Sequence, residues 1–220
     1  MFLRIVLVNN LNMLSDDKEN FNQQQVWDEI ADGWTHYRHR PFRDIEKFAK
    51  KFQGKKILDI GCGNCRQLIP FIGNELYGID FSKKMIKNAK KFCKNNNMKV
   101  HLLVAEATKL PFEDEYFDGI ICISVIHHLK PEEANKAIEE IYRVLKKDGK
   151  GLISIWLKEG HGERYVSWQK KGKTLMRFHY FYSKDTIEEM IKNSGFEFNS
   201  WISEIGKNKQ MNLFIEIRKQ

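Results

Sequence analysis

The sequence lacks long apolar runs and has few cysteines and prolines. No stretch approaches the roughly 20 apolar residues that a membrane-spanning helix needs, so no membrane segment is expected. Four cysteines among 220 residues do not make a disulfide framework in a chain of this size, which favours reduced thiols and a cytoplasmic location. Residues 1–8 are apolar but too short for a secretory signal, and they lack a small-residue cleavage site. We treat residues 1–20 as an N-terminal extension.

No repeat and no low-complexity linker divides the chain. Hydrophobic residues make up 42% and charged residues 30% of the sequence, as is typical of a soluble globular protein. The length suits one α/β domain with a full core, which we place at residues 21–220. The net charge of +8 allows an acidic partner such as a nucleic acid. Solvated lysines give the same value, so charge alone identifies no partner.

Apolar strands alternate with amphipathic helices along most of the chain. Helices are expected within 20–52, broken at Pro41, and at 82–96, 131–147 and 183–195. Strands are expected at 56–60, 75–80, 99–107, 118–126, 150–156, 196–205 and 212–218, the last two forming a hairpin around residues 206–209. Asp148-Gly149 is expected to end the third helical segment, and 157–179 to be irregular and basic. Alternation of this kind predicts a mostly parallel sheet with helices on both faces.

The segment KILDIGCGNC, residues 56–65, carries the strongest functional signal. Gly61 and Gly63 allow the backbone to turn tightly and to approach a ligand where any Cβ would collide. Asp80 ends the next parallel strand, where a carboxylate can accept hydrogen bonds from a ribose diol. Two neighbouring strand ends therefore predict a crevice for a nucleoside cofactor.

The loop does not match the dinucleotide fingerprint, because the third glycine is absent. Asp59 precedes the loop and would repel a pyrophosphate but attract a cation. A cofactor with an amino group and no phosphate fits these residues, and S-adenosylmethionine is such a molecule. The run D-I-G-C-G-N resembles the first motif of class I S-adenosylmethionine-dependent methyltransferases, with Cys65 where a third glycine is usual.

That resemblance implies a Rossmann-like fold with seven strands in the order 3-2-1-4-5-7-6, strand seven being antiparallel. It also implies a cofactor site whose members can be carried over by position. They are Trp34, Asp59, Gly61, Cys62, Gly63, Asp80, Phe81, Glu106, Ala107 and Ser124. Glu106-Ala107 occupies the place of an acidic motif that contacts adenine, although acids are also common in surface turns.

No metal site is expected. Cys62 and Cys65 form a C-x-x-C pair, but both lie inside the glycine loop. Cys93 and Cys122 are not spaced as a second ligand pair.

Two flanking segments narrow the resemblance. VWDEIADGWTHYRHRPF (26–42) and YVSWQKKGKTLMRFHYF (165–181), together with ISVIHHL (123–129), resemble the tRNA wobble-uridine carboxymethyl methyltransferases. The resemblance implies methyl-ester formation on 5-carboxymethyluridine in the tRNA anticodon loop. It also implies a small zinc-binding activator protein docked on the edge strand, residues 99–104, whose apolar sequence is unusual for an exposed edge.

The candidate catalytic residues follow from this chemistry. A carboxylate with a pKa of about 4 is ionised at neutral pH, so it needs positioning rather than a general base. Arg38 and Arg177, with Arg164 behind them, can each fork onto a carboxylate. His127 and His128 follow the central strand and can position a substrate or shuttle a proton, or one of them can cap the next helix. The basic, aromatic segment 157–179 is expected to face the RNA.

Two other functions fit the same core motifs. A small-molecule methyltransferase, acting on a quinone or a fatty acid, would not need the basic segment 157–179. A non-catalytic subunit that keeps the fold is the second alternative, and Cys65 and Glu106 are the features that favour it.

Overall fold

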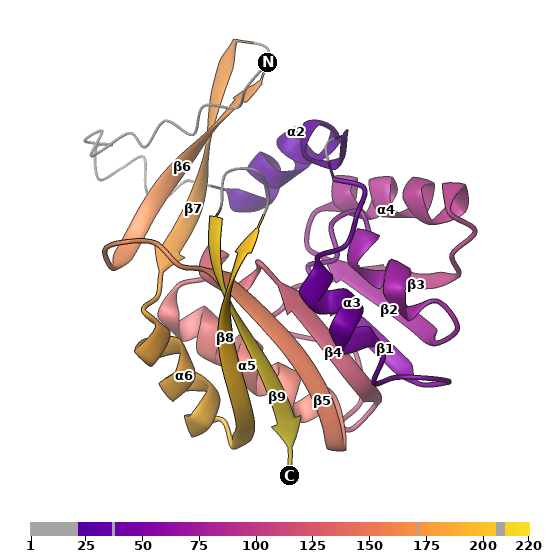
Figure 1. Cartoon of the computed structure of the whole chain (residues 1–220). Coiled ribbons are helices and arrows are strands. Elements are labelled where there is room, and N and C mark those ends of the chain that lie inside the picture. The colour runs from indigo at the N-terminus through magenta and orange to yellow at the C-terminus, as the bar shows by residue number, and fades with distance from the viewer. Residues whose placement is uncertain (1–21, 37, 171, 206–209) are drawn as a thin grey trace.

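A seven-stranded sheet forms the centre of the computed structural model, which describes residues 22–36, 38–170, 172–205 and 210–220. Its order is β3-β2-β1-β4-β5-β9-β8, and β9 runs antiparallel to both of its neighbours (Figure 1). The strands are β1 (Lys56–Ile60), β2 (Glu75–Asp80), β3 (Val100–Val104), β4 (Phe117–Ile123), β5 (Leu145–Trp156), β8 (Phe196–Ile205) and β9 (Gln210–Lys219). The strand order and the antiparallel strand confirm the sequence-based expectation. The connection 206–209 lies outside the described residues.

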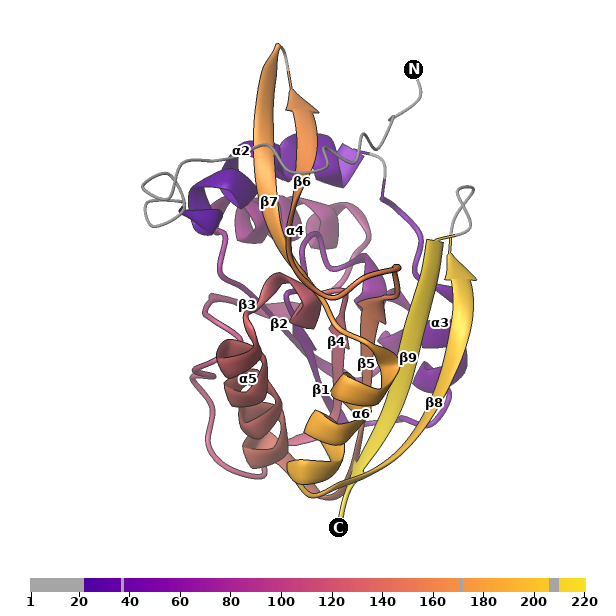
Figure 2. The same cartoon turned by 90° about the vertical axis from the view of Figure 1, so that its left-hand side faces the viewer.

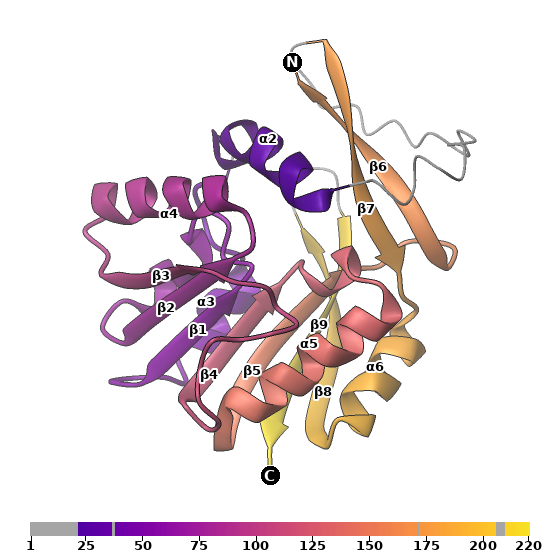
Figure 3. The same ribbon diagram turned by 180° about the vertical axis from the view of Figure 1, so that it is seen from behind.

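Helices cover both faces of this sheet, as expected. They are α2 (Gln23–His36), α3 (Arg43–Ala49), α4 (Lys83–Asn95), α5 (Pro131–Val144) and α6 (Lys184–Asn193), with 3-10 turns η1 (Arg66–Phe71) and η2 (Ile126–His128). Helices α5 and α6 lie in front of the sheet in Figure 3, and α3 lies on the opposite face, toward the viewer in Figure 1. The segment with Pro70 forms a short 3-10 helix rather than an α-helix, because proline cannot donate the hydrogen bond that an α-helix requires.

The alternation of side chains along the central strands explains why both faces are covered. In β4, Ile120 and Cys122 belong to the apolar cluster under α5 and α6, whereas Ile121 and Ile123 belong to the cluster under α3 and α4. Because successive strand residues point to opposite faces, a strand that is apolar throughout must be buried on both sides. This burial fixes the carboxyl ends of β1, β2 and β4 at one edge of the sheet.

Local hydrogen bonds set the helix boundaries. The Ser82 side chain accepts the backbone N–H of Met85 and caps α4, as predicted. The prediction that Asp148-Gly149 ends the preceding helix is wrong: α5 ends at Val144 and β5 begins at the next residue. Asp148 has φ 61° and lies in an irregular part of β5. There β5 has extra residues relative to β4 between the pair Phe117 and Leu145 and the pair Gly119 and Lys150, as in a β-bulge.

Residues 157–179 are not irregular as predicted. Most of them form a separate two-stranded antiparallel hairpin, β6 (Gly162–Lys170) and β7 (Lys173–Phe181). The hairpin rises beyond the carboxyl edge of the main sheet, next to α2 (Figure 2). The Gln23 side chain joins α2 to β7, because it accepts the N–H of Phe178 at 2.9 Å and donates to the carbonyl of Met176 at 3.4 Å.

Strand β3 lies at the edge of the sheet, as predicted. Its apolar side chains Leu103 and Val104 are 42% and 47% exposed. Within the described residues, no helix is long and apolar enough to cross a membrane.

The central strand should carry much of the stability. Ile121 is fully buried, whereas Ile202 is 49% exposed on β8. We expect Ile121→Ala to lower the free energy of unfolding by about 2–5 kcal/mol, because it leaves a cavity between sheet and helices. The matched change Ile202→Ala should cost less than about 1 kcal/mol. Chemical denaturation of both variants measures the difference, and equal losses would contradict this account of the core.

Candidate active site

The glycine loop after β1 has the backbone conformation that its sequence predicts. Gly61 and Gly63 have φ values of +66° and +54°, and a Cβ on Gly61 would lie 2.3 Å from Val125 Cγ2. Cys65, which replaces the usual third glycine, is also left-handed with φ 67°. This conformation explains why glycine is usual at that position, since other residues adopt it only at a cost.

Asp80 lies beside this loop and is 7% exposed. One carboxylate oxygen accepts the N–H of Gly63 at 3.0 Å, and the other accepts the N–H of Ser82 at 2.9 Å. Burial raises the pKa of Asp80 to about 6, although the two backbone N–H groups oppose the shift. The ends of β1 and β2 are thus brought together at the predicted ribose-binding position.

Asp59 is the buried carboxylate before the loop, 1% exposed. Its Oδ2 has no hydrogen-bond partner among the described residues. Burial raises its pKa well above the usual value, and the charge of Arg66 only partly opposes this. An ammonium group would supply the missing partner, so the donor set fits a cofactor with an amino group.

The remaining predicted cofactor residues surround the same strand ends. The carbonyl of Phe81 accepts the Gln24 side chain at 2.6 Å, and Ser124 has φ 61° after β4. Glu106 is exposed and lies near the hydroxyl of Thr108, and Ala107 is half-buried beside it.

Aromatic rings and arginines pack around the glycine loop that follows β1. A Cβ on Gly63 would lie 2.9 Å from the Trp34 ring, so Trp34 packs directly on the glycine. The Arg38 guanidinium lies 4.5 Å from the centre of the same ring, and that of Arg66 lies 5.5 Å from it. Arg177 comes from β7, and its guanidinium carbon lies 5.8 Å from the ring centre of Trp27 and 5.4 Å from that of Trp168.

The positive charges of Arg38, Arg66 and Arg177 are not neutralised by close carboxylates among the described residues. Arg177 and Arg66 are each 6% exposed. Burial and the charge of Arg38 lower the pKa of both to about 10. Among the described residues, the ion pairs within 4.0 Å involve none of these three arginines. An anion would therefore be strongly attracted here.

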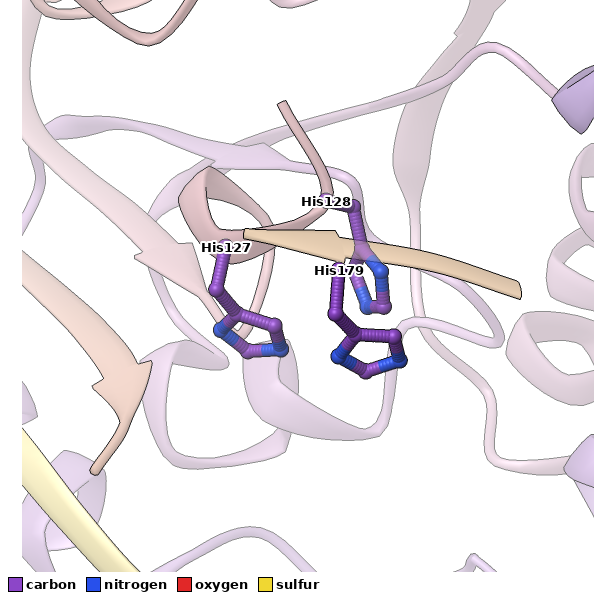
Figure 4. A group of neighbouring side chains, drawn as sticks. All are labelled: His127, His128 and His179. Atoms are coloured by element: carbon purple, nitrogen blue, oxygen red, sulfur yellow. The ribbon is translucent and has the colours of Figure 1, made fainter. Parts of the chain in front are cut away.

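Three histidines form a cluster close enough to Arg177 for its charge to act on them. His127 and His128 come from η2, and His179 comes from β7 (Figure 4). Their ring centres are 4.3–5.4 Å apart, and one ring nitrogen of each lies within 4.8 Å of the others. His127 also stacks on Trp156, with ring centres 5.1 Å apart. Neither histidine of η2 caps α5, which begins with the Glu133 side chain accepting the N–H of Lys130.

In addition to burial, the charge of Arg177 lowers the pKa of His127 and His128, and the charge of Arg38 lowers the pKa of Arg177, so these four predicted residues are neighbours. Sequence reasoning missed Arg66 and His179. The alternation of Arg177 and His179 could have shown that both face the same side, had residues 173–181 been recognised as a strand. Arg164 is exposed on β6 and pairs across the hairpin with His179.

The thiols of the C-x-x-C pair are buried and protonated at neutral pH. The contact with Cys65 lowers the pKa of Cys62, but burial and the charges of Asp59 and Asp80 raise it to about 11 overall. Protonated thiols are poor metal ligands and poor nucleophiles.

Comparison with known proteins agrees with the geometry. A family model described as a methyltransferase domain matches residues 58–153. A protein of Methanocaldococcus jannaschii, described as uncharacterized protein MJ1123, is 33% identical over 155 residues, which cover 70% of each chain. A tRNA (carboxymethyluridine(34)-5-O)-methyltransferase of Arabidopsis thaliana is 36% identical over 137 residues, covering 61% of this chain and about a third of the relative (32%). The protein of that name from Schizosaccharomyces pombe is 26% identical over 210 residues, covering 80% of this chain and 89% of the relative.

Residues 58–153 match a methyltransferase domain, and the fold of the chain is that of the class I S-adenosylmethionine-dependent methyltransferases. The methyltransferase shares its fold with a 1,6-didemethyltoxoflavin-N1-methyltransferase of Burkholderia thailandensis, at a TM-score of 0.74 and 16% identity over 100% of this chain and 98% of that one. That structure contains S-adenosylhomocysteine. In this chain, Asp59, Gly61, Gly63 and Asp80 are the residues whose geometry fits S-adenosylmethionine.

Cofactor binding should depend on pH through Asp80. Its carboxylate accepts hydrogen bonds from a ribose diol only when ionised, and its pKa is raised to about 6. We therefore expect affinity for S-adenosylmethionine to be full above pH 6 and to fall as the pH drops through 6. Isothermal titration calorimetry at pH values below and above 6 measures this change in affinity.

The variant Asp80→Asn should bind about tenfold or more weakly and lose this pH dependence, because a hydrogen bond to a charged group is removed. Asp185→Asn, at an exposed position on α6, is the matched control. An unchanged pH profile in Asp80→Asn would show that another group titrates.

Proposed function

We propose that the methyltransferase forms the methyl ester of 5-carboxymethyluridine at the anticodon wobble position of tRNA, in the cytoplasm. The names of the relatives support the substrate class. The observation that carries the proposal is the pair of arginines, Arg38 and Arg177, held over aromatic rings without carboxylate partners among the described residues. An acceptor that brings its own negative charge suits this site.

The chemistry asks little of the protein beyond placement. S-Adenosylmethionine, when bound, supplies a methyl group on a sulfonium. A carboxylate already carries the electron pair that the methyl group needs, so no proton has to be removed and no general base is required. Arg38 and Arg177 are placed to hold the carboxylate and exclude other orientations, which is the larger part of the task.

The same charges favour release of the product. A methyl ester is neutral, so its attraction to Arg38 and Arg177 is much weaker than that of a carboxylate. Arg38 and Arg177, which have no carboxylate partner among the described residues, therefore distinguish substrate from product by charge.

The hairpin β6–β7 is the part of the molecule that we propose contacts the RNA. Arg164 and Lys173 are exposed on it, and basic side chains of this kind pair with phosphates. Trp168 belongs to the aromatic residues of the segment that is expected to face the RNA, but it is only 7% exposed. It packs against Gly33 and Arg177 instead, so its role is to support the arginine.

We further propose that a small zinc-binding activator protein adds a strand along β3. The support is the position of β3 at the edge of the sheet and the exposure of Leu103 and Val104 there. An exposed apolar edge invites strand addition, which would also cover these two side chains.

Methyl transfer from labelled S-adenosylmethionine to tRNA that lacks this ester tests the proposal, with and without the activator protein. We expect label in a base-labile ester on the wobble uridine, and more of it when the activator is present. Nucleoside analysis identifies the product. Cofactor binding without tRNA labelling under either condition would reject the proposal and favour a small-molecule acceptor.

Replacement of Arg38 separates substrate positioning from cofactor binding. Arg38→Ala should reduce kcat/KM for tRNA by about 10- to 100-fold, because a charge-assisted hydrogen bond is lost, while the Kd for S-adenosylmethionine changes little. Arg40→Ala, two residues away with an exposed side chain, should leave both unchanged. A loss of cofactor affinity as large as the loss of kcat/KM would instead make Arg38 a cofactor ligand.

A further inference from the structure

Buried polar atoms without partners gather between η2 and β7. They are Arg177 Nε, His127 Nε2, and both ring nitrogens of His179, and none has a hydrogen-bond partner among the described residues. His127 and His179 are 0% exposed. Buried polar groups are normally satisfied because leaving one without a partner is costly, so several in one place indicate a site that a ligand completes.

The hydrogen bonds of the rings indicate which atoms donate. His127 Nδ1 lies 3.2 Å from the backbone nitrogen of Trp156, whose N–H it accepts. In a neutral ring the proton then belongs to Nε2, which becomes a donor. His128 Nδ1 lies 2.9 Å from the carbonyl of Phe178 and donates to it. Burial and neighbouring positive charges lower the pKa of all three histidines, to about 3 for His128, so the rings are neutral at pH 7.

A metal ion is a poor match for this cluster despite its three imidazoles. The lone pair of His127 is engaged by Trp156, which leaves its Nε2 a proton rather than a lone pair. The positive charges of Arg177 and Lys158 act on His179, and both would repel a cation. Two N–H groups from Arg177 and His127 call for an acceptor, and the positive field calls for an anion.

We propose that His127 Nε2–H and Arg177 Nε–H form a two-donor site for a carboxylate group, which His179 completes as a third, adjustable partner. This rests on the proposed function, since it identifies the carboxylate as that of the acceptor uridine. Arg177 and His179 are two residues apart on β7 and so face the same side. A single strand therefore delivers a charged donor and a neutral one to the same group.

The combination suits a nucleophilic carboxylate. A fully paired guanidinium holds a carboxylate tightly but withdraws electron density from it, whereas a neutral imidazole N–H binds more weakly. Neutral imidazoles in place of further cations therefore help Arg38 and Arg177 to hold the group while leaving it reactive. Because His127 and His179 are fully buried, entry of the carboxylate requires β7 to move away from η2, and the bond between His128 and Phe178 is one of the contacts that must open.

The test compares a carboxylate with its neutral isostere. The probes are 5-carboxymethyluracil and 5-carbamoylmethyluracil, titrated calorimetrically into the full chain saturated with S-adenosylhomocysteine. We expect the carboxylate to bind more tightly, and His127→Phe to reduce its affinity about 10- to 100-fold while affinity for the amide stays within about twofold. Phe keeps the stacking on Trp156. His127→Gln, which retains a donor near Nε2, should restore most of the preference, and Asp185→Asn at an exposed position on α6 is the control.

A spectroscopic readout separates binding from stability. Long-range ¹H–¹⁵N spectra of the histidine rings should show His127 protonated at Nε2, and its signal should shift when 5-carboxymethyluracil is added but not when the amide is added. An equal loss of both ligands in His127→Phe, or an unshifted His127 signal, would overturn the proposal. So would zinc binding at the three rings that excludes the carboxylate.

The two proposals fail differently. Carboxylate-selective binding that depends on His127, without methylation of tRNA, would reject the proposed function and keep this site. Methylation of wobble 5-carboxymethyluridine that is unaffected in KM by His127→Phe and His179→Phe would keep the function and reject this site.

Discussion

The carboxylate of Asp80 is the contact on which the cofactor end of the molecule depends. It accepts one N–H from the glycine loop and one from Ser82, and Ser82 in turn caps α4 and hydrogen-bonds to Asp28 of α2. One acid thereby joins the ends of β1 and β2 and, through Ser82, links them to two helices. Its burial is unfavourable for the charged form, which the raised pKa expresses. Two backbone N–H groups are enough to keep an acid there, and a ribose diol would add to them.

Beyond the cofactor, the site is organised by positive charge. Arg38, Arg66 and Arg177 lie among tryptophan rings, where burial weakens their hydration and lowers the pKa of each. Three neutral histidines line the same region. Such an arrangement costs stability in the free protein, and it is the kind of cost that is found at binding sites. The fold supplies stability elsewhere, in the two apolar clusters that sandwich the sheet.

The sequence predicts the central sheet and the cofactor loop better than it predicts the hairpin β6–β7 and its packing on α2. Strands β1, β2 and β4 are short and apolar, and the glycine loop and Asp80 follow them at local spacings, so periodicity and turn chemistry were sufficient. The sequence does not predict the hairpin β6–β7, because lysines interrupt the alternation of apolar and polar residues along it. In addition, Trp168 and His179 are buried by contacts with α2 and η2, which are distant in sequence. Asp148-Gly149 was mistaken for a helix end, although it lies in an irregular part of β5. The features that could not be predicted are those that depend on packing between segments distant in sequence.

The contact between Gln23 and the backbone of β7 has a consequence for the transfer of specificity between related enzymes. Most of the predicted cofactor residues lie between Asp59 and Ser124, whereas the acceptor side of the site is assembled from α2 and from a hairpin more than a hundred residues later. An exchange of the hairpin alone would leave the Gln23 amide facing a foreign strand, and an exchange of α2 alone would remove Trp27 from Arg177. The two segments must therefore be exchanged together. A chimaera designed to change the acceptor specificity would have to carry both α2 and the hairpin β6–β7.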